Sequence, residues 1–137
     1  MHWTKYIAVI IAMVLLNACR IEDEFVWKSI KVNVTAYNSV PSQTDSLPNI
    51  AAWGDTLKPH LKSIAVSRDL INLGMTYNTL VKIEGLEGVF LVKDKTNPRF
   101  SKRIDIFMGN DVQKAKNWGR KKLTVSYRVK RDSILKN

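Results

Sequence analysis

The sequence of 137 residues is poor in the residue types that build disulfide scaffolds and metal clusters. It contains one cysteine, Cys19, and two histidines, His2 and His60. A single thiol cannot close an internal disulfide, and these three side chains are too few and too scattered for a zinc cluster or for a Ser/His/Asp triad with a metal site beside it. We therefore expect a fold held by its hydrophobic core, with no metal and no other cofactor.

Long apolar runs are also scarce, and the exception lies near the start of the chain. The run "YIAVIIAMVLL" (Tyr6–Leu16) has only eleven residues and follows the positively charged Lys5. It is too short to cross a bilayer as a helix, and this arrangement is typical of a signal peptide. The adjoining "LNAC" (Leu16–Cys19) resembles the lipobox of bacterial lipoproteins, which implies cleavage after residue 18 and a diacylglycerol on Cys19. The alternative is a free cysteine buried at the end of an ordinary helix.

Acidic residues are few relative to basic ones, so the protein is strongly basic. There are 22 lysines and arginines against 12 acids, and removing residues 1–18 takes away Lys5 and no acid, which leaves +9. A basic cytosolic protein would suggest a nucleic acid as partner. The predicted export argues against that partner, and the sequence has no zinc-finger, RRM or helix-turn-helix pattern.

Outside the inner membrane, the anionic partners are lipid head groups and peptidoglycan, whose stem peptides carry carboxylates. We expect a protein held on a membrane through lipidated Cys19, placed at the outer membrane and facing the periplasm. The excess of lysines has a second interpretation, namely that it only keeps the domain soluble. Charge alone does not separate the two.

The rest of the chain is long enough for one domain with one core. We predict a tether over residues 19–29, a single domain over residues 30–131 and a tail over residues 132–137. A loop rich in Pro, Ser, Asn and Asp follows the first strand, over residues 38–49.

Short apolar segments separated by turn residues predict six strands. These are residues 30–37, 63–66, 79–83, 88–94, 103–107 and 122–129. One helix is predicted near the end of the chain, with Asn110 as its N-cap, Asp111 in its first turn and Gly119 at its end. Six short strands with so little helix indicate a small, mainly β barrel.

Two aspartates stand out, because Asp94 ends one predicted strand and Asp105 lies in the next. If these strands pair antiparallel about the Pro98–Arg99 region, the carboxylates become cross-strand neighbours with Cβ atoms about 5 Å apart. Two like charges at that range cannot both ionise cheaply. One carboxyl would then keep its proton to higher pH and become a candidate general acid.

Alternation along "RIDIF" places Asp105 on the face opposite to Ile104 and Ile106. Asp105 is therefore expected at a rim and not in the core. A plainer interpretation is a surface carboxylate that pairs with Lys102 or Arg103.

Several motifs occur in the order found in the 3D, or three-aspartate, domain. They are "VTAY" (34–37), "AAWG" (51–54), "IAVSRDLINLG" (64–74), Asp94, "KRIDIF" (102–107) and "AKNWGRKKLTV" (115–125). The chain thus resembles the 3D domain family, which includes the catalytic module of membrane-bound lytic murein transglycosylase A-type enzymes. The resemblance implies a six-stranded double-psi β-barrel with one short helix and a groove for glycan strands. It also implies cleavage of the bond between N-acetylmuramic acid and N-acetylglucosamine to a 1,6-anhydro product.

By this resemblance, Asp105 is the acid that protonates the glycosidic oxygen and then, as carboxylate, accepts the proton of the C6 hydroxyl. Asp94 would tune the pKa of Asp105 and bind substrate or water. Tyr37 and Lys102 would hold sugar or stem-peptide groups. The first aspartate of the family falls at a serine, residue 67, so Asp69 is the remaining substrate-binding candidate.

Three functions remain open at this point. The first is a lytic transglycosylase. The second is a non-catalytic peptidoglycan-binding lipoprotein of the rare lipoprotein A-like kind, which uses the same groove. The third is a structural envelope protein whose basic face meets anionic lipid or glycan. The oligomeric state is left open.

Overall fold

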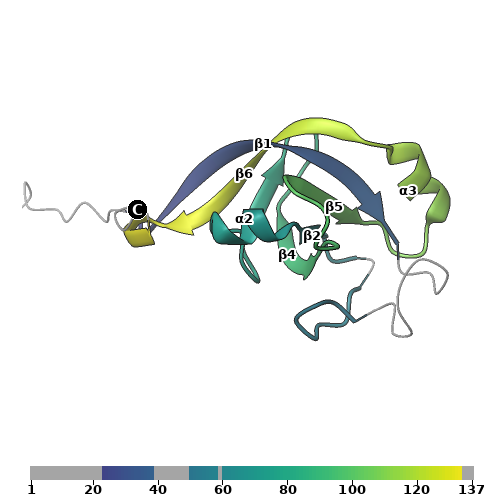
Figure 1. The fold of residues 1–137 in the computed structure, drawn as a ribbon, viewed down its shortest axis with the longest axis horizontal. Coiled ribbons are helices and arrows are strands. Elements are labelled where there is room, and N and C mark those ends of the chain that lie inside the picture. Colours follow the sequence, from purple (N-terminus) through teal and green to yellow (C-terminus); the bar gives the residue numbers. More distant parts are fainter. Residues whose placement is uncertain (1–22, 39–49, 59, 134–137) are drawn as a thin grey trace, which may run out of the picture.

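The computed structural model describes residues 23–38, 50–58 and 60–133, and its main feature is a closed barrel of six strands (Figure 1). The strands are β1 (Phe25–Tyr37), β2 (Ser63–Val66), β3 (Leu80–Ile83), β4 (Phe90–Lys95), β5 (Arg103–Phe107) and β6 (Lys121–Lys130). The mainly β, six-stranded barrel predicted from the sequence is confirmed. Around the barrel the order is β1-β5-β2-β4-β3-β6, and β6 closes on β1.

The barrel mixes parallel and antiparallel neighbours. Strand β1 pairs with β5 in parallel, and β2 pairs with β4 in parallel, while the other four pairs are antiparallel. Parallel neighbours need crossover connections, because a tight turn cannot join them. This arrangement is compatible with a double-psi topology.

Strand β1 is longer than predicted. It begins at Phe25, and its first six residues pair with Val125–Lys130 of β6, so that the two strands form the long ribbon seen across Figure 1. Residues 25–29 therefore belong to the barrel, and the predicted tether of residues 19–29 was wrong for this part. Backbone pairing with β6 extends the strand beyond the stretch that alternates clearly in sequence, and such a partner is visible only in the fold.

The interior of the barrel is apolar. The most deeply buried residues come from all six strands and from the segment after β2: Val32, Val34, Ile64, Val66, Leu70, Met75, Val81, Val92, Ile104 and Val125. On β5 the alternation predicted from "RIDIF" is confirmed, since Ile104 and Ile106 are buried in this core. A smaller cluster lies outside the barrel wall, where Ala51 and Leu57 cover Phe107 and Tyr37.

Two short helices and one 3-10 turn complete the described chain. Helix α3 (Val112–Trp118) is the predicted helix, and its N-cap is Asp111, whose carboxylate accepts a hydrogen bond from the Lys114 amide at 2.8 Å. The predicted N-cap, Asn110, was therefore one residue too early. Helix α2 (Arg68–Asn72) was not expected, and the 3-10 turn η1 (Arg131–Ser133) follows β6. Among the described residues, no helix has the length and apolarity needed to cross a membrane.

Candidate carboxylate site

The two aspartates lie in one row that crosses four strands of the barrel. Thr35 on β1 pairs with Asp105 on β5, Asp105 pairs with Ala65 on β2, and Ala65 pairs with Asp94 on β4. We call these four residues the carboxylate row. Strand β2 thus separates β4 from β5, and the prediction that Asp94 and Asp105 are direct cross-strand neighbours was wrong. Two interstrand spacings put their Cα atoms about 10 Å apart.

A register shift in β2–β4 aligns Asp94 with the row. Ile64 pairs with Val92 and Ala65 pairs with Asp94, so β4 holds one extra residue, Lys93, at this point. Such β-bulges re-aim side chains next to functional sites. Here the bulge lets Asp94 meet groups outside the core, even though Val92, two residues before it, is fully buried.

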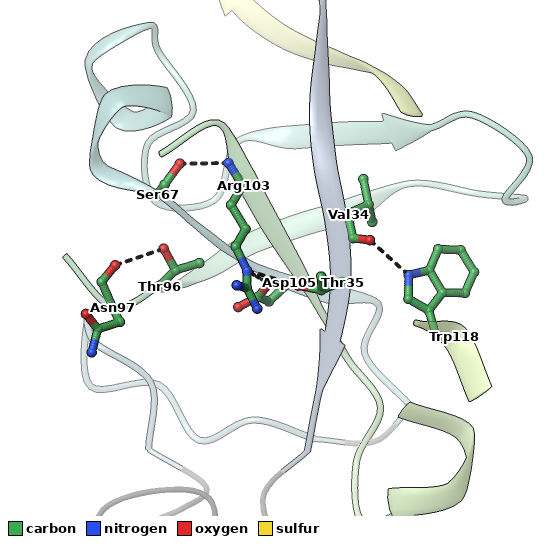
Figure 2. A network of polar contacts seen from close by, with 8 residues as sticks. All are labelled: Val34, Thr35, Ser67, Thr96, Asn97, Arg103, Asp105 and Trp118. Carbon is green, nitrogen blue, oxygen red and sulfur yellow. Dashed lines mark hydrogen bonds and ion pairs between the residues drawn. The ribbon is translucent and has the colours of Figure 1, made fainter. Parts of the chain in front are cut away.

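Asp105 is engaged by two neighbours (Figure 2). The Arg103 Nε atom lies 2.7 Å from Asp105 Oδ1, and the hydroxyl of Thr35 donates to the same oxygen. Both charged side chains are largely buried, with 18% of Arg103 and 13% of Asp105 exposed. Pairing with Arg103, one of the two partners suggested by the sequence, is therefore confirmed. In both contacts Asp105 is the hydrogen-bond acceptor.

Asp94 has partners of its own on both oxygens. Its Oδ1 accepts from the backbone amides of Ala52 at 2.7 Å and Lys95 at 2.8 Å, and its Oδ2 accepts from the Tyr37 hydroxyl at 3.3 Å. The segment 50–58 is thus tied to the barrel wall through this carboxylate. Tyr37 and Asp94, both predicted site residues, are brought together.

The phenol of Tyr37 is affected by the negative charges of both Asp94 and Asp105. Burial raises the pKa of its phenol far above the usual value, and the charge of Asp94, the hydrogen bond to Asp94 and the charge of Asp105 raise it further. Each of these effects disfavours the phenolate. Tyr37 therefore keeps its proton at any physiological pH and acts at the row as a hydrogen-bond donor.

Asp69 and Lys102 interact with each other in a turn before β5 and do not contact the carboxylate row. Asp69 Oδ2 accepts from the Lys102 amide at 2.9 Å and from the Ser101 hydroxyl at 3.1 Å, where Lys102 has a positive φ of 47°. Burial acts to raise the pKa of Asp69, but hydrogen bonds from the Ser67 hydroxyl, Lys102 and Ser101 outweigh it and lower the pKa. The side chain of Lys102 is exposed, and the cation that reaches Asp105 belongs to Arg103.

An aromatic platform borders the row and was missed in the sequence. We define it as Trp53, Tyr77 and Lys95: the two rings are 5.6 Å apart at 45°, and Lys95 Nζ lies 4.5 Å from the Trp53 ring. Lys95 directly follows Asp94, and Trp53 directly follows Ala52, so the platform adjoins the site. The "AAWG" motif was its only signal in the sequence, because Tyr77 comes from a distant loop.

Asp55 anchors the Tyr77 side chain of the platform. The Tyr77 hydroxyl donates to its carboxylate at 2.6 Å, and Lys93 Nζ lies 2.8 Å from the same oxygen. Two hydrogen bonds lower the pKa of Asp55, and the one from Lys93 has the larger effect, ahead of the one from Tyr77. The same hydrogen bond to Asp55 raises the pKa of Lys93. A cavity of about 450 Å³ opens beside the platform and is lined by Trp53, Arg68, Ile71, Asn72, Thr76, Tyr77 and Lys95.

The metal and lipid-anchor predictions concern different parts of the chain. Within the described ranges, no group of three or more His, Cys, Asp or Glu side chains is placed to hold a metal ion. Cys19 and the predicted signal peptide over residues 1–18 lie outside the described residues, and so do most of the predicted loop over residues 38–49 and the end of the predicted tail.

Comparison with known proteins identifies the fold and no more. No protein-family model matches the sequence, and neither does any curated protein. Among solved structures, the chain is similar to a Streptomyces papain inhibitor, with a TM-score of 0.51 and 14% sequence identity. The match covers 75% of this chain and 96% of the inhibitor. The chain thus shares its barrel with a small protein whose sequence is very different.

Proposed function

We propose that this protein is a lipid-anchored envelope protein that binds peptidoglycan without cleaving it. The observation that carries the proposal is the state of Asp105, which forms an ion pair with Arg103 and accepts a hydrogen bond from Thr35. A transglycosylase needs a protonated acid at the glycosidic oxygen. In the row, Asp105 and Asp94 both accept hydrogen bonds from neighbouring protein groups, as carboxylates with a structural role do.

The aromatic platform supports binding of glycan. Sugars present flat apolar faces that stack on aromatic rings, together with hydroxyls that need polar partners. Trp53 and Tyr77 supply the rings, and the cations of Arg68 and Lys95 line the adjacent cavity. The same cations are complementary to the carboxylates of stem peptides.

The similar barrel of the Streptomyces protein is compatible with a non-catalytic role, since its name describes an inhibitor. The motifs that resemble the 3D domain family support a place at the cell wall, and the predicted signal peptide and the lipobox-like "LNAC" support an anchor at Cys19. The predicted place is the periplasmic side of the outer membrane.

Incubation with purified sacculi separates this proposal from the transglycosylase hypothesis. We expect the protein to sediment with sacculi and to release no anhydro-muropeptides detectable by mass spectrometry. The Trp53→Ala variant should lose at least ten-fold in affinity. Trp27→Ala, which removes an exposed tryptophan from the far part of β1, is the matched control and should bind normally.

Two outcomes would contradict the proposal. Anhydro-muropeptides that disappear with Asp105→Asn would establish the transglycosylase. A protein that neither cleaves nor sediments would favour the structural envelope protein. The anchor has its own test, because Cys19→Ser should abolish incorporation of labelled fatty acid and release the protein from membranes.

A further inference from the structure

A second cavity lies away from the carboxylate row, at the end of the barrel that carries α3. Its volume is about 620 Å³. Its walls come from residues 60–62, from the β3–β4 connection, from the end of β5, and from α3 with the start of β6. The lining residues are His60, Leu61, Lys62, Leu86, Glu87, Phe90, Ile106, Phe107, Met108, Lys114, Asn117, Trp118 and Lys121. We call it the lysine cavity.

The lining includes several apolar side chains. Phe90, Ile106 and Phe107 are each less than 8% exposed, and Met108 and Trp118 are partly buried against the core. Trp118 is held in place by a hydrogen bond of 3.3 Å from its indole N–H to the carbonyl of Val34, which Figure 2 shows. A rigid apolar surface of this kind favours the burial of a hydrocarbon or aromatic group.

Three lysines line the same cavity, and two of them are positioned by uncharged groups. Lys62 Nζ donates to the carbonyl of Glu87 at 2.6 Å and lies 5.8 Å from the Phe90 ring. Lys121 Nζ lies 3.8 Å from the Trp118 ring. Carbonyl and ring contacts orient an ammonium group without cancelling its charge.

No acid of the described chain forms an ion pair with these lysines. Among the described residues, Lys62, Lys114 and Lys121 form no salt bridge, whereas Lys93 pairs with Asp55 and Lys130 with Glu24 elsewhere. Glu87 is the single acid that lines the cavity within the described chain, and its contact with Lys62 is through the backbone carbonyl. The rim therefore keeps a positive charge beside an apolar surface.

We propose that the lysine cavity binds a small amphiphilic anion, with its apolar body on Phe90, Phe107 and Trp118 and its anionic group at the lysines. Ligand sites of 300–1,000 Å³ commonly combine a mostly apolar lining with a few convergent polar groups, and this cavity has both. A carboxylate at the end of a hydrocarbon chain is the simplest ligand of this class. The proposal is independent of peptidoglycan binding.

Titration of the full chain with decanoate, below its micelle concentration, tests the proposal by NMR. We expect saturable shifts of the Trp118 indole resonance and the Met108 methyl resonance, both of which report from the lining. Acetate has the charge without the apolar body, and decanol has the body without the charge. Each should bind at least ten-fold more weakly than decanoate.

A pair of charge-matched variants tests the role of the lysines. Lys114→Gln with Lys121→Gln should weaken decanoate binding at least ten-fold, measured at Met108. Lys31→Gln with Lys82→Gln removes the same charge from residues that do not line the cavity and should change the affinity less than two-fold. Unchanged resonances from the barrel core show that both variants are folded.

Three results would overturn the proposal. The first is the absence of a saturable shift at Trp118 and Met108. The second is decanol binding as tightly as decanoate, which would remove the role of the charge. The third is an equal loss of affinity in both double variants, which would show that only the overall charge matters.

Discussion

The carboxylate row and the lysine cavity use charge in opposite ways. In the row, Asp105 and Asp94 accept hydrogen bonds from Arg103, Thr35, Tyr37 and two backbone amides, so the buried charges have partners. In the cavity, the lysines lie beside apolar residues without acidic partners among the described residues. Groups that satisfy one another stabilise a fold, whereas charges left unpaired beside an apolar surface are available to a ligand.

Strand β5 contributes to both regions. Asp105 contacts Arg103 and Thr35 in the row, and the next residue, Ile106, is buried in the core and lines the lysine cavity. Because successive side chains of a strand point to opposite faces, adjacent positions serve different environments. The following predictions test whether the row stabilises the fold and whether the cavity serves to bind a ligand.

The largest effect is expected from Asp105→Ala. This change leaves the largely buried guanidinium of Arg103 without its partner and should lower the free energy of unfolding by about 3 kcal/mol. Urea denaturation followed by circular dichroism measures it. The double variant Asp105→Leu with Arg103→Met, in which no buried charge is stranded, should recover much of the loss. A loss below about 0.5 kcal/mol, the range of ordinary surface changes, would mean that the row is not structural.

A smaller effect is expected from Ala65→Leu. Ala65 is 3% exposed and separates Asp105 from Asp94 in the row, so a larger side chain has to displace the groups beside it. Overpacking of this kind should cost about 2 kcal/mol. Thermal unfolding measures the cost. Leu91→Ile, a volume-conserving change on β4, is the control, and an unchanged melting temperature for Ala65→Leu would show that the row contains free space.

Tyr37→Phe should cost about 1.5 kcal/mol, because it removes one hydrogen bond to a charged acceptor. It should also change the response to alkaline pH. The pKa of Tyr37 is raised in the folded state. Only the unfolded chain therefore releases this proton as the pH rises above about 10, so stability falls from there upward and is unaffected below.

Denaturation curves at pH 8 and at pH 11 measure this difference. The wild type should lose more stability between the two values than Tyr37→Phe. Tyr127, whose pKa is also raised by burial, contributes to the fall in both proteins and serves as the internal reference. Equal losses in the two proteins would contradict the burial of the Tyr37 hydroxyl between the carboxylates.

The smallest effect on stability is expected from Asp111→Ala, which removes the N-cap of α3 and should cost about 1 kcal/mol. Because α3 forms one wall of the lysine cavity, the variant should also weaken decanoate binding while leaving the row intact. Chemical denaturation and the same NMR titration measure both effects. Asn110→Ala, at the N-cap position predicted from the sequence, should cost less than Asp111→Ala.

Much of the barrel could be predicted because its signals are local. The segment "RIDIF" became β5 with the predicted bounds, and 63–66 became β2 without change. Period-two alternation and turn residues determine such strands through neighbouring positions alone. The start of β1 at Phe25 could not be found in this way, because its partner, β6, is about a hundred residues away.

The candidate site was harder to predict. The sequence indicated that Asp94, Asp105 and Tyr37 belong together. The structure places the two aspartates in one row and joins Tyr37 to Asp94 by a hydrogen bond, while Asp105 acts on Tyr37 through its charge. The predicted distance between the two carboxylates was wrong, because the prediction assumed that the consecutive strands β4 and β5 are neighbours in the barrel. The lysine cavity had no sequence signal, since Lys62, Phe90 and Lys121 come from three separate segments.

The sequence by itself determined where the six strands lie along the chain, which face of β5 is apolar, and where α3 ends at Gly119, whose φ of 67° suits a residue without a side chain. The tertiary structure alone decided that β2 lies between β4 and β5, and thereby which groups meet each aspartate. The reason is physical: alternation and turn propensity act within a few residues, whereas strand order depends on how the whole barrel closes around one core.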